Sequence, residues 1–279
     1  MQNKSRGVLY ICPTPIGNLK DITYRVMECL NYVDIIACED TRESKKLLDF
    51  LEIDKKTTSY HKFNQEEKGK IIIEKLKEGK NIALITDAGT PTISDPGSYL
   101  VADAVKSKID VTSLPGPSAV ITALAATGFR CDNFFFQGFL PRKGPERQIA
   151  ISRMTTLNCP VVFYESPNRL YKTMEEIAAR GTHLNVVIAR ELTKVYEEYI
   201  RGTAKELLEK LKDKKIKGEV TVIVEGGILS EEELTEKEIE ELLSKLIENG
   251  FTKKEAVKNL AELTGISKKQ IYHIAVNCL

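Results

Sequence analysis

The fold is decided by the stretch Asn81–Gly97, which has the sequence NIALITDAGTPTISDPG. Its apolar run Ile82–Ile85 is typical of a buried strand, and a helical pattern begins after Gly97. Between the two lies a loop with two Asp, two Thr, one Ser, two Pro and two Gly. Ligands of open α/β sheets usually bind at such loops, at the carboxyl ends of strands. We therefore predict a ligand-binding loop, with a well-capped surface turn as the alternative.

Other strand candidates of the first half have the same arrangement, because each ends in a polar or Gly/Pro loop and most are followed by a helical pattern. These candidates are Val8–Cys12, Ile35–Cys38, Thr57–Tyr60 and Val111–Leu114. This rhythm predicts a mostly parallel sheet with helices on both faces. The strand-end loops should then meet at one edge and form a cleft that faces the second half of the chain; they are Pro13–Leu19, Glu39–Arg42, Asp87–Gly97 and Pro115–Ala119.

A second series of strands and helices follows residue 116, and the composition becomes almost entirely helix-forming after Gly226-Gly227. We predict an α/β protein with two α/β domains, a cofactor cleft between them and a small C-terminal helical module. The expected boundaries are 1–116, 117–228 and 229–279.

The last fifty residues predict three helices, near 236–248, 253–263 and 268–278, each opened by a possible capping box; the boxes begin at Thr235, Thr252 and Ser267. The last two helices have helix-turn-helix spacing. Lysines outnumber glutamates there, which predicts one basic face, with a solvated tail packed on the body as the alternative.

Composition excludes several classes of protein. A formal net charge of +1 gives no global basic field, so contact with nucleic acid must come from local patches. No apolar run approaches the length of a membrane span, and the first residues lack the features of a signal peptide. Six Cys without a CxxC pair, and three widely spaced His, predict a cytoplasmic protein with reduced thiols and no metal. GxGxxG, GxxxxGK[ST], GxSxG and HExxH motifs are absent.

Several long and unusual motifs of the chain nevertheless resemble those of the tetrapyrrole methylase superfamily, two-domain methyltransferases that use S-adenosylmethionine. Within it, the chain is similar to the branch that methylates the ribose 2′-oxygen of a decoding-centre cytidine in small-subunit ribosomal RNA. The matching motifs run in order from about residue 8 to 227: Thr14–Leu19, Ala37–Arg42, Asp87–Gly97, Pro115–Ala119, Gln137–Arg142, Phe163–Arg169, Ala189–Lys194 and Gly218–Thr221.

The resemblance implies a bent S-adenosylmethionine between the two domains, and a homodimer. It places the cofactor against Ile16, Gly17, Asn18, Asp87, Gly89, Thr90, Ile93, Ser94, Asp95, Ser118, Ala119, Tyr164, Leu192 and Thr193. Carboxylates and carbonyls suit the cationic groups and ribose hydroxyls of this cofactor, and helix N-terminal amides suit its carboxylate. Asp95 and Ser118 also have a simpler interpretation as helix N-caps.

Catalysis requires that the methyl group and the accepting oxygen be aligned, and a proton acceptor would help a weakly nucleophilic hydroxyl. The candidates for that base are Glu39, Asp40 and His61, with positioning alone as an alternative. Glu39 could instead form an ion pair with Arg42. Tyr60 or Phe63 could stack on a splayed base. The predicted contacts with RNA are Arg42, Arg142, Lys143, Arg147, Lys253, Lys254, Lys268 and Lys269.

Two other functions remain open from the sequence. A small-molecule methyltransferase could use the basic Arg142–Arg147 segment for an acidic tetrapyrrole, although the helical tail argues against this. A non-catalytic RNA-binding protein that senses the cofactor would bind it without turnover.

Overall fold

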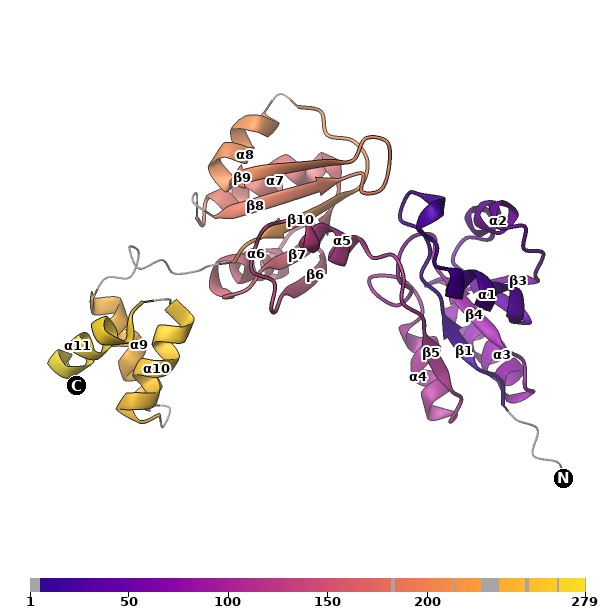
Figure 1. The fold of residues 1–279 in the computed structure, drawn as a ribbon, viewed down its shortest axis with the longest axis horizontal. Helices are drawn as coiled ribbons and strands as arrows, with labels where there is room; N and C mark the ends of the chain where they lie inside the picture. Colours follow the sequence, from indigo (N-terminus) through magenta and orange to yellow (C-terminus); the bar gives the residue numbers. More distant parts are fainter. Residues whose placement is uncertain are drawn as a thin grey trace.

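The computed structural model describes residues 6–181, 184–212, 214–226, 236–248, 251–264 and 266–278. Two α/β domains follow one another along the chain and a helical module comes last (Figure 1). The first domain has a five-stranded sheet in the order β3-β2-β4-β1-β5, with every neighbouring pair parallel. Its strands are β1 (Leu9–Ile11), β2 (Ile35–Cys38), β3 (Thr57–Ser59), β4 (Ile82–Ile85) and β5 (Val111–Ser113).

Helices cover both faces of this sheet: α1 (Tyr24–Tyr32), α2 (Thr41–Phe50), α3 (Gln65–Lys77) and α4 (Ser98–Lys106). Alternate side chains of each strand enter different cores. In β2, Ile35 and Ala37 pack with α3 and α4, whereas Ile36 and Cys38 pack with α1 and α2. Both faces of the central strands β2 and β4 are buried, which is why these two strands are continuous apolar runs in the sequence. The predicted parallel sheet is therefore confirmed.

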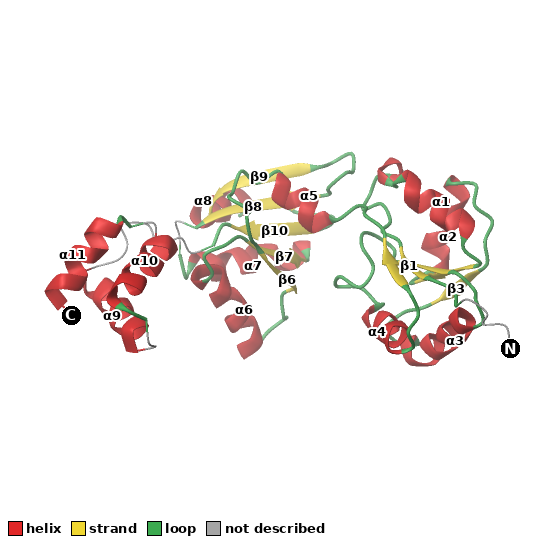
Figure 2. Ribbon diagram, turned by 60° about the horizontal axis from the view of Figure 1, so that its bottom comes forward, coloured by secondary structure: helices red, strands yellow, loops and turns green. Residues whose placement is uncertain are grey.

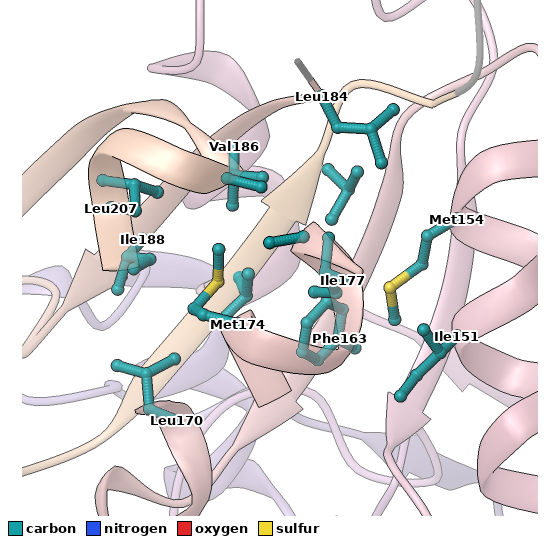
Figure 3. Packing of buried hydrophobic residues seen from close by; sticks show 14 of the residues in the cluster. Ile151, Met154, Phe163, Leu170, Met174, Ile177, Leu184, Val186, Ile188 and Leu207 are labelled. Atoms are coloured by element: carbon teal, nitrogen blue, oxygen red, sulfur yellow. The ribbon is translucent and has the colours of Figure 1, made fainter. Parts of the chain in front are cut away.

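The second domain has a mixed sheet in the order β6-β7-β10-β8-β9, in which only β6 and β7 pair in parallel. Its strands are β6 (Phe135–Phe139), β7 (Val161–Glu165), β8 (Asn185–Arg190), β9 (Glu198–Thr203) and β10 (Val220–Val224). Its helices are α5 (Ala119–Ala125), α6 (Pro145–Thr156), α7 (Pro167–Ala178) and α8 (Ala204–Leu211). Figure 3 shows the core between the sheet and α6–α8, with Phe163 and Met174 inside it. The other face carries α5 and turns toward the first domain.

The C-terminal module consists of α9 (Glu236–Glu248), α10 (Lys253–Thr264) and α11 (Lys268–Cys278), which lie together apart from the α/β domains in Figure 2. Apolar side chains of the three helices form a small core. All three predicted helices are confirmed. A capping box opens α10, because the Thr252 hydroxyl accepts from the N–H of Glu255 and the Glu255 carboxylate accepts from the N–H of Thr252. At α11 the Ser267 hydroxyl accepts from the N–H of Gln270 and so caps the helix. Thr235 lies outside the described residues. The domain boundaries at 116 and 228 stay predictions. Within the described part, no helix is long and apolar enough to cross a membrane.

Candidate cofactor cleft between the two α/β domains

A cavity of about 360 Å³ lies between the two α/β domains. Its size falls in the range of roughly 300–1,000 Å³ that is common for small-molecule sites. The first domain and the start of α5 supply Ile16, Glu39, Thr86, Asp87, Ala88, Gly89, Thr90, Ile93, Ser94, Asp95, Ser118 and Ala119. The second supplies Phe139, Tyr164, Glu165, Ser166, Pro167, Ala189, Leu192, Gly218, Glu219, Val220 and Thr221. Each domain thus provides about half of the wall.

Hydrogen bonds join the three strand-end loops that form the first wall. Thr14 and Gly89 exchange backbone hydrogen bonds at 2.9 and 3.0 Å, and the Thr14 hydroxyl donates to the carbonyl of Thr86. The Thr90 hydroxyl donates to the carbonyl of Pro117 at 3.2 Å. The loops after β1, β4 and β5 are therefore neighbours, and the predicted convergence of these turns on one crevice is confirmed.

The central loop, Asp87–Gly97, contains residues with unusual backbone φ angles. Thr92 and Ser94 both have positive φ angles, 76° and 65°, which are unfavourable for residues with a Cβ. Gly97 is fixed at φ 137°, where a Cβ would come within 2.7 Å of Leu84. Strain of this kind concentrates at ligand sites, where the surrounding structure holds it in place. Here it accompanies the placement of Asp95 at the cavity.

Aromatic rings form part of the opposite wall. The ring of Tyr164, at the end of β7, lies 5.3 Å from that of Phe139 and 5.2 Å from that of Phe136, centroid to centroid. Burial, together with the negative charges of Asp95 and Glu219, raises the pKa of Tyr164 to about 12. Tyr164 is therefore a neutral donor that faces a carboxylate of the other domain.

The two domains approach closely at Gly17. A Cβ at this position would lie 2.5 Å from Cγ of Lys194 and 2.9 Å from the hydroxyl of Thr193, both in the second domain. Next to it, Ile16 is buried among α5 and the apolar residues of the second sheet, including Leu192. The loop after β1 therefore joins the first domain to the core of the second.

Three carboxylates of the first domain line the cavity, and their neighbours hold them in place. The Thr86 hydroxyl donates to Oε2 of Glu39 at 3.0 Å. Burial, together with the nearby charge of Glu39, raises the pKa of Asp95 to about 6, although a hydrogen bond with Thr86 acts in the opposite direction. Burial also raises the pKa of Asp87, against a hydrogen bond from the backbone N–H of Asp40. A partly desolvated acidic wall of this kind favours cationic ligand groups.

Most of the predicted cofactor residues line the cavity, and three do not. The side chain of Asn18 accepts from the N–H of Lys20 and caps the short 3₁₀ helix Leu19–Asp21. Gly17 lies at the interdomain contact, and Thr193 beside it has a buried hydroxyl without a partner in the described part of the protein. The residues that do line it are Ile16, Asp87, Gly89, Thr90, Ile93, Ser94, Asp95, Ser118, Ala119, Tyr164 and Leu192.

The two predicted helix caps have different outcomes. Asp95 does not cap α4, whose N-cap is Gly97 without a side-chain hydrogen bond. Ser118 does cap α5, where its hydroxyl accepts from the N–H of Ile121 at 3.5 Å, and it lines the cavity as well.

Of the three candidate bases, only Glu39 lines the cavity. Asp40 is the N-cap of α2 and holds the Arg42 guanidinium at 2.7 Å, an interaction that lowers the pKa of Asp40 to about 2. The ion pair considered between Glu39 and Arg42 is not formed in the structure. Arg42 pairs with Asp40, and Glu39 accepts a hydrogen bond from Thr86. His61 follows β3, packs edge-on against Phe63 and has a buried Nδ1 without a partner among the described residues. Neither Asp40 nor His61 is part of the cavity wall.

The prediction that Arg147 contacts RNA is wrong. Its guanidinium is buried and donates to Glu176, Thr173 and the carbonyl of Pro141. The spacing Arg147, Ala150, Ile151 and Met154 places it on the inner face of α6, a periodicity that was visible in the sequence. Arg142 and Lys143 are exposed in the loop before this helix.

The two candidate stacking residues also differ. Tyr60 is 1% exposed and belongs to the first core, so it cannot stack on a base. Phe63 is exposed, with the ammonium of Lys62 at 4.9 Å from its ring centroid.

Sequence reasoning missed part of the second wall, in particular Phe139 and the segments Glu165–Pro167 and Gly218–Thr221. Their signal was present, because both segments belong to motifs that carry the family resemblance. Glu165 ends the apolar strand β7, and its carboxylate is nearly fully buried, at 3.1 Å from Nε of Arg169 and 2.7 Å from the Thr173 hydroxyl. In the described ranges, no group of three or more His, Cys, Asp or Glu could hold a metal ion.

The residues of the cleft fit a group with the chemistry of S-adenosylmethionine. The carboxylates of Glu39, Asp87 and Asp95 suit its sulfonium and ammonium cations, and the hydroxyls of Thr90 and Ser118 suit its polar groups. The apolar and aromatic side chains suit an adenine ring; they are Ile16, Ile93, Phe139, Tyr164 and Leu192.

Taken together, the fold and the cleft define a two-domain α/β protein that binds a small ligand between its domains. The chain belongs to the tetrapyrrole (corrin/porphyrin) methylases, whose family model matches residues 8–208.

The chain is similar over nearly its whole length to two bacterial proteins called ribosomal RNA small subunit methyltransferase I. It is 43% identical to that of Halalkalibacterium halodurans, over 98% of this chain and 96% of the relative. It is 42% identical to that of Bacillus subtilis, over 95% and 93%.

Solved structures of low sequence identity share the fold. A diphthine synthase superposes with a TM-score of 0.63 at 14% identity, over 78% of this chain and 90% of that one. A uroporphyrin-III C-methyltransferase from Thermus thermophilus in complex with S-adenosylhomocysteine superposes with a TM-score of 0.56 at 14% identity, over 78% and 97%.

Proposed function

We propose that the protein is an S-adenosylmethionine-dependent methyltransferase that acts in the cytoplasm on the ribose 2′-oxygen of a cytidine in the decoding centre of 16S ribosomal RNA. The observation that carries the proposal is the interdomain cleft with its acidic wall in a chain that is 43% identical to a ribosomal RNA small subunit methyltransferase I. The cleft accounts for the donor, and the relatives' name indicates the acceptor.

In this proposal, the eleven predicted residues that line the cavity hold the cofactor, which supplies an activated methyl group on a sulfonium sulfur. Gly17 and Thr193 act beside them, where the two domains meet. Asp87 and Asp95 place negative charge in a partly desolvated site, where it binds cationic groups more strongly than it would in water. Tyr164 donates a hydrogen bond and closes the apolar side of the cleft.

Glu39 is the residue that we propose as the proton acceptor. Its carboxylate is at the cavity, at the end of β2, and the hydrogen bond from Thr86 fixes its orientation. When the substrate hydroxyl attacks the methyl group, the O–H electron pair remains on the oxygen and the proton passes to a carboxylate oxygen of Glu39. The C–S bond breaks, and its electron pair stays on sulfur. A positioned base of this kind contributes about 10²–10⁴-fold to a rate.

Contact with the RNA backbone is proposed for the exposed Arg142 and Lys143, for Arg42 at the start of α2, and for the exposed lysines of the helical module. Arg42 uses Nε and Nη2 for Asp40, which leaves other N–H groups free to donate. We also propose a homodimer, as the family resemblance implies, which sedimentation equilibrium of the full chain tests by its mass.

Methyl transfer from labelled S-adenosylmethionine to purified small ribosomal subunits that lack this modification tests the proposed reaction. Label in the ribose of one decoding-centre cytidine is the expected result. Label in an added tetrapyrrole acceptor, or cofactor binding without transfer to any acceptor, would favour one of the two other functions and reject this one.

A further inference from the structure

The C-terminal module has a groove of its own, about 470 Å³ in volume, between α10 and α11. From α10 it is lined by Lys254, Val257 and Lys258, and from α11 by Lys268, Lys269 and Tyr272, with Glu255 at its edge. This groove shares no residue with the cleft between the α/β domains.

The four lysines of the groove have no ion-pair partner among the described residues. They differ in this from some lysines of the α/β domains, such as Lys46 and Lys77, each of which pairs with a glutamate one turn away. Lys254 and Lys258 are four residues apart and thus share one face of α10, and Lys268 and Lys269 stand together at the start of α11. Like charges this close repel one another, and an anionic ligand would relieve that repulsion.

Glu255, the one carboxylate among the described residues that line the groove, does not neutralise these lysines. It accepts hydrogen bonds from the N–H and the hydroxyl of Thr252, as the N-terminal capping box of α10. The same hydrogen bonds lower the pKa of Glu255, so that its charge is fixed at the start of the helix. The groove therefore keeps an excess of positive charge.

An exposed aromatic ring lies among these cations. Tyr272 is 57% exposed, one turn after Lys268 and Lys269, while its neighbours Ile271 and Ile274 fill the core of the module. Lysines next to an exposed aromatic ring are the arrangement that proteins use for unpaired nucleic acid, in which ammonium groups hold phosphates and a base stacks on the ring. An acidic peptide would match the charge but would give the ring no flat partner.

We infer that this groove binds an unpaired segment of the RNA substrate, with a base stacked on Tyr272 and phosphates held by Lys254, Lys258, Lys268 and Lys269. The inference rests on the proposed function for the identity of the RNA. It places a second RNA contact at a distinct site, so that the groove retains substrate independently of the methyl donor.

Binding of a fluorescent, unstructured oligocytidylate to the full-length protein without cofactor tests this inference. Tyr272→Ala should weaken binding about 5-fold or more, since stacking of one base contributes roughly 1–3 kcal/mol, and Tyr272→Phe should keep most of the affinity. Tyr24→Ala, which removes an exposed ring of α1, is the matched control and should bind as the unchanged protein does. Lys258→Ala with Lys269→Ala should reduce the salt dependence, by about 0.7 in slope for each phosphate that is no longer neutralised.

Equal affinity of Tyr272→Ala and the unchanged protein would overturn the inference, as would equal binding of a duplex RNA or an oligoglutamate of the same charge. The proposed reaction is read separately, by methylation of small subunits. If the protein methylates small subunits but Tyr272→Ala does not weaken RNA binding, the proposed groove is rejected and the proposed reaction stands. If Tyr272→Ala weakens RNA binding but no acceptor is methylated, the proposed reaction is rejected and the groove stands.

Discussion

The hydroxyl of Thr86 donates its hydrogen bond to Glu39 at 3.0 Å, and the same hydroxyl contacts the carboxylate of Asp95. A hydroxyl has one proton, so it cannot donate to both carboxylates at once. When Glu39 and Asp95 are both ionised, one of them lacks that donor and faces a like charge. The structure thus has a reason to hold a proton in this part of the cleft, close to where the proposed reaction releases one.

Replacement of Glu39 by Gln should lower the rate of methyl transfer by about 10²–10⁴-fold while cofactor affinity changes little. The amide oxygen still accepts from Thr86, so that the local structure is preserved, but it no longer takes up a proton. Single-turnover transfer and calorimetric binding of the cofactor measure the two effects.

Asp40→Asn is the control for this variant. Asparagine is an equally good N-cap, and Asp40 is not part of the cavity wall, so activity should stay close to that of the unchanged protein. If Glu39→Gln were as active as Asp40→Asn, the proton would be accepted elsewhere or by no residue.

Asp95→Asn should stabilise the protein at neutral pH and weaken its binding of the cofactor. The folded-state pKa of Asp95, about 6, lies above the ordinary value of 3.8 because the charged carboxylate is partly desolvated. Between these two values the folded state holds a proton that the unfolded state has lost, so stability falls as pH rises through this window. The penalty is then fully present above pH 6 and absent below about 3.8.

Melting temperatures of both proteins from pH 4 to 8, without cofactor, measure this difference. The advantage of Asp95→Asn should grow as pH increases toward 6 and stay constant beyond it. A constant difference over the whole range would mean that the Asp95 charge has no part in it.

Gly17→Ala should weaken cofactor binding, because a methyl group 2.5 Å from Cγ of Lys194 must displace the side chains of Thr193 and Lys194 or move the two domains apart. Gly128→Ala is the matched control, with a positive φ of 82° but open space around the missing Cβ. It should reduce stability by about 1–2 kcal/mol through backbone strain and leave cofactor affinity unchanged. If Gly17→Ala and Gly128→Ala bound the cofactor with equal affinity, the close approach at Gly17 would have no effect on the cleft.

Arg147→Met should lower stability, whereas Arg142→Ala should alter RNA binding. Loss of Arg147 leaves the carboxylate of Glu165 buried with fewer partners, and a broken buried ion pair typically lowers the free energy of unfolding by about 3–5 kcal/mol. Arg142 is exposed, so Arg142→Ala should leave stability unchanged and reduce the salt dependence of RNA binding. Denaturant titration and RNA binding at several salt concentrations distinguish the two roles. A destabilised Arg142→Ala would contradict this assignment.

Much of this architecture follows from local patterns in the sequence. Continuous apolar runs such as Ile35–Cys38 identified the parallel strands, since both of their faces are buried. Ser and Thr before the last two helices located the beginnings of those helices. The loops around Asp87 and Ile16 were predicted to meet because parallel strands bring their carboxyl ends to one edge.

The misplaced residues depend on tertiary structure. Arg147 looked like part of a basic surface segment, but the carboxylate to which it donates, Glu176, is twenty-nine positions away on α7, and only the packing of α6 against α7 brings them together. Asp40 and Glu39 are adjacent in sequence, and their roles differ because one caps α2 whereas the other points to Thr86. Which of the two adjacent carboxylates reaches the cavity depends on the direction of each side chain, and the local sequence does not specify that direction.

The buried carboxylate of Glu165 has a consequence for anyone who would redesign the RNA preference of this protein. It lines the cleft, and it pairs with Arg147 and Arg169, which both donate to the carbonyl of Pro141, just before the exposed basic loop. The side chains of Arg142 and Lys143 are exposed, so they can be exchanged freely to suit another RNA. The scaffold that presents them cannot be altered without disturbing the wall of the cleft, to which Glu165 belongs.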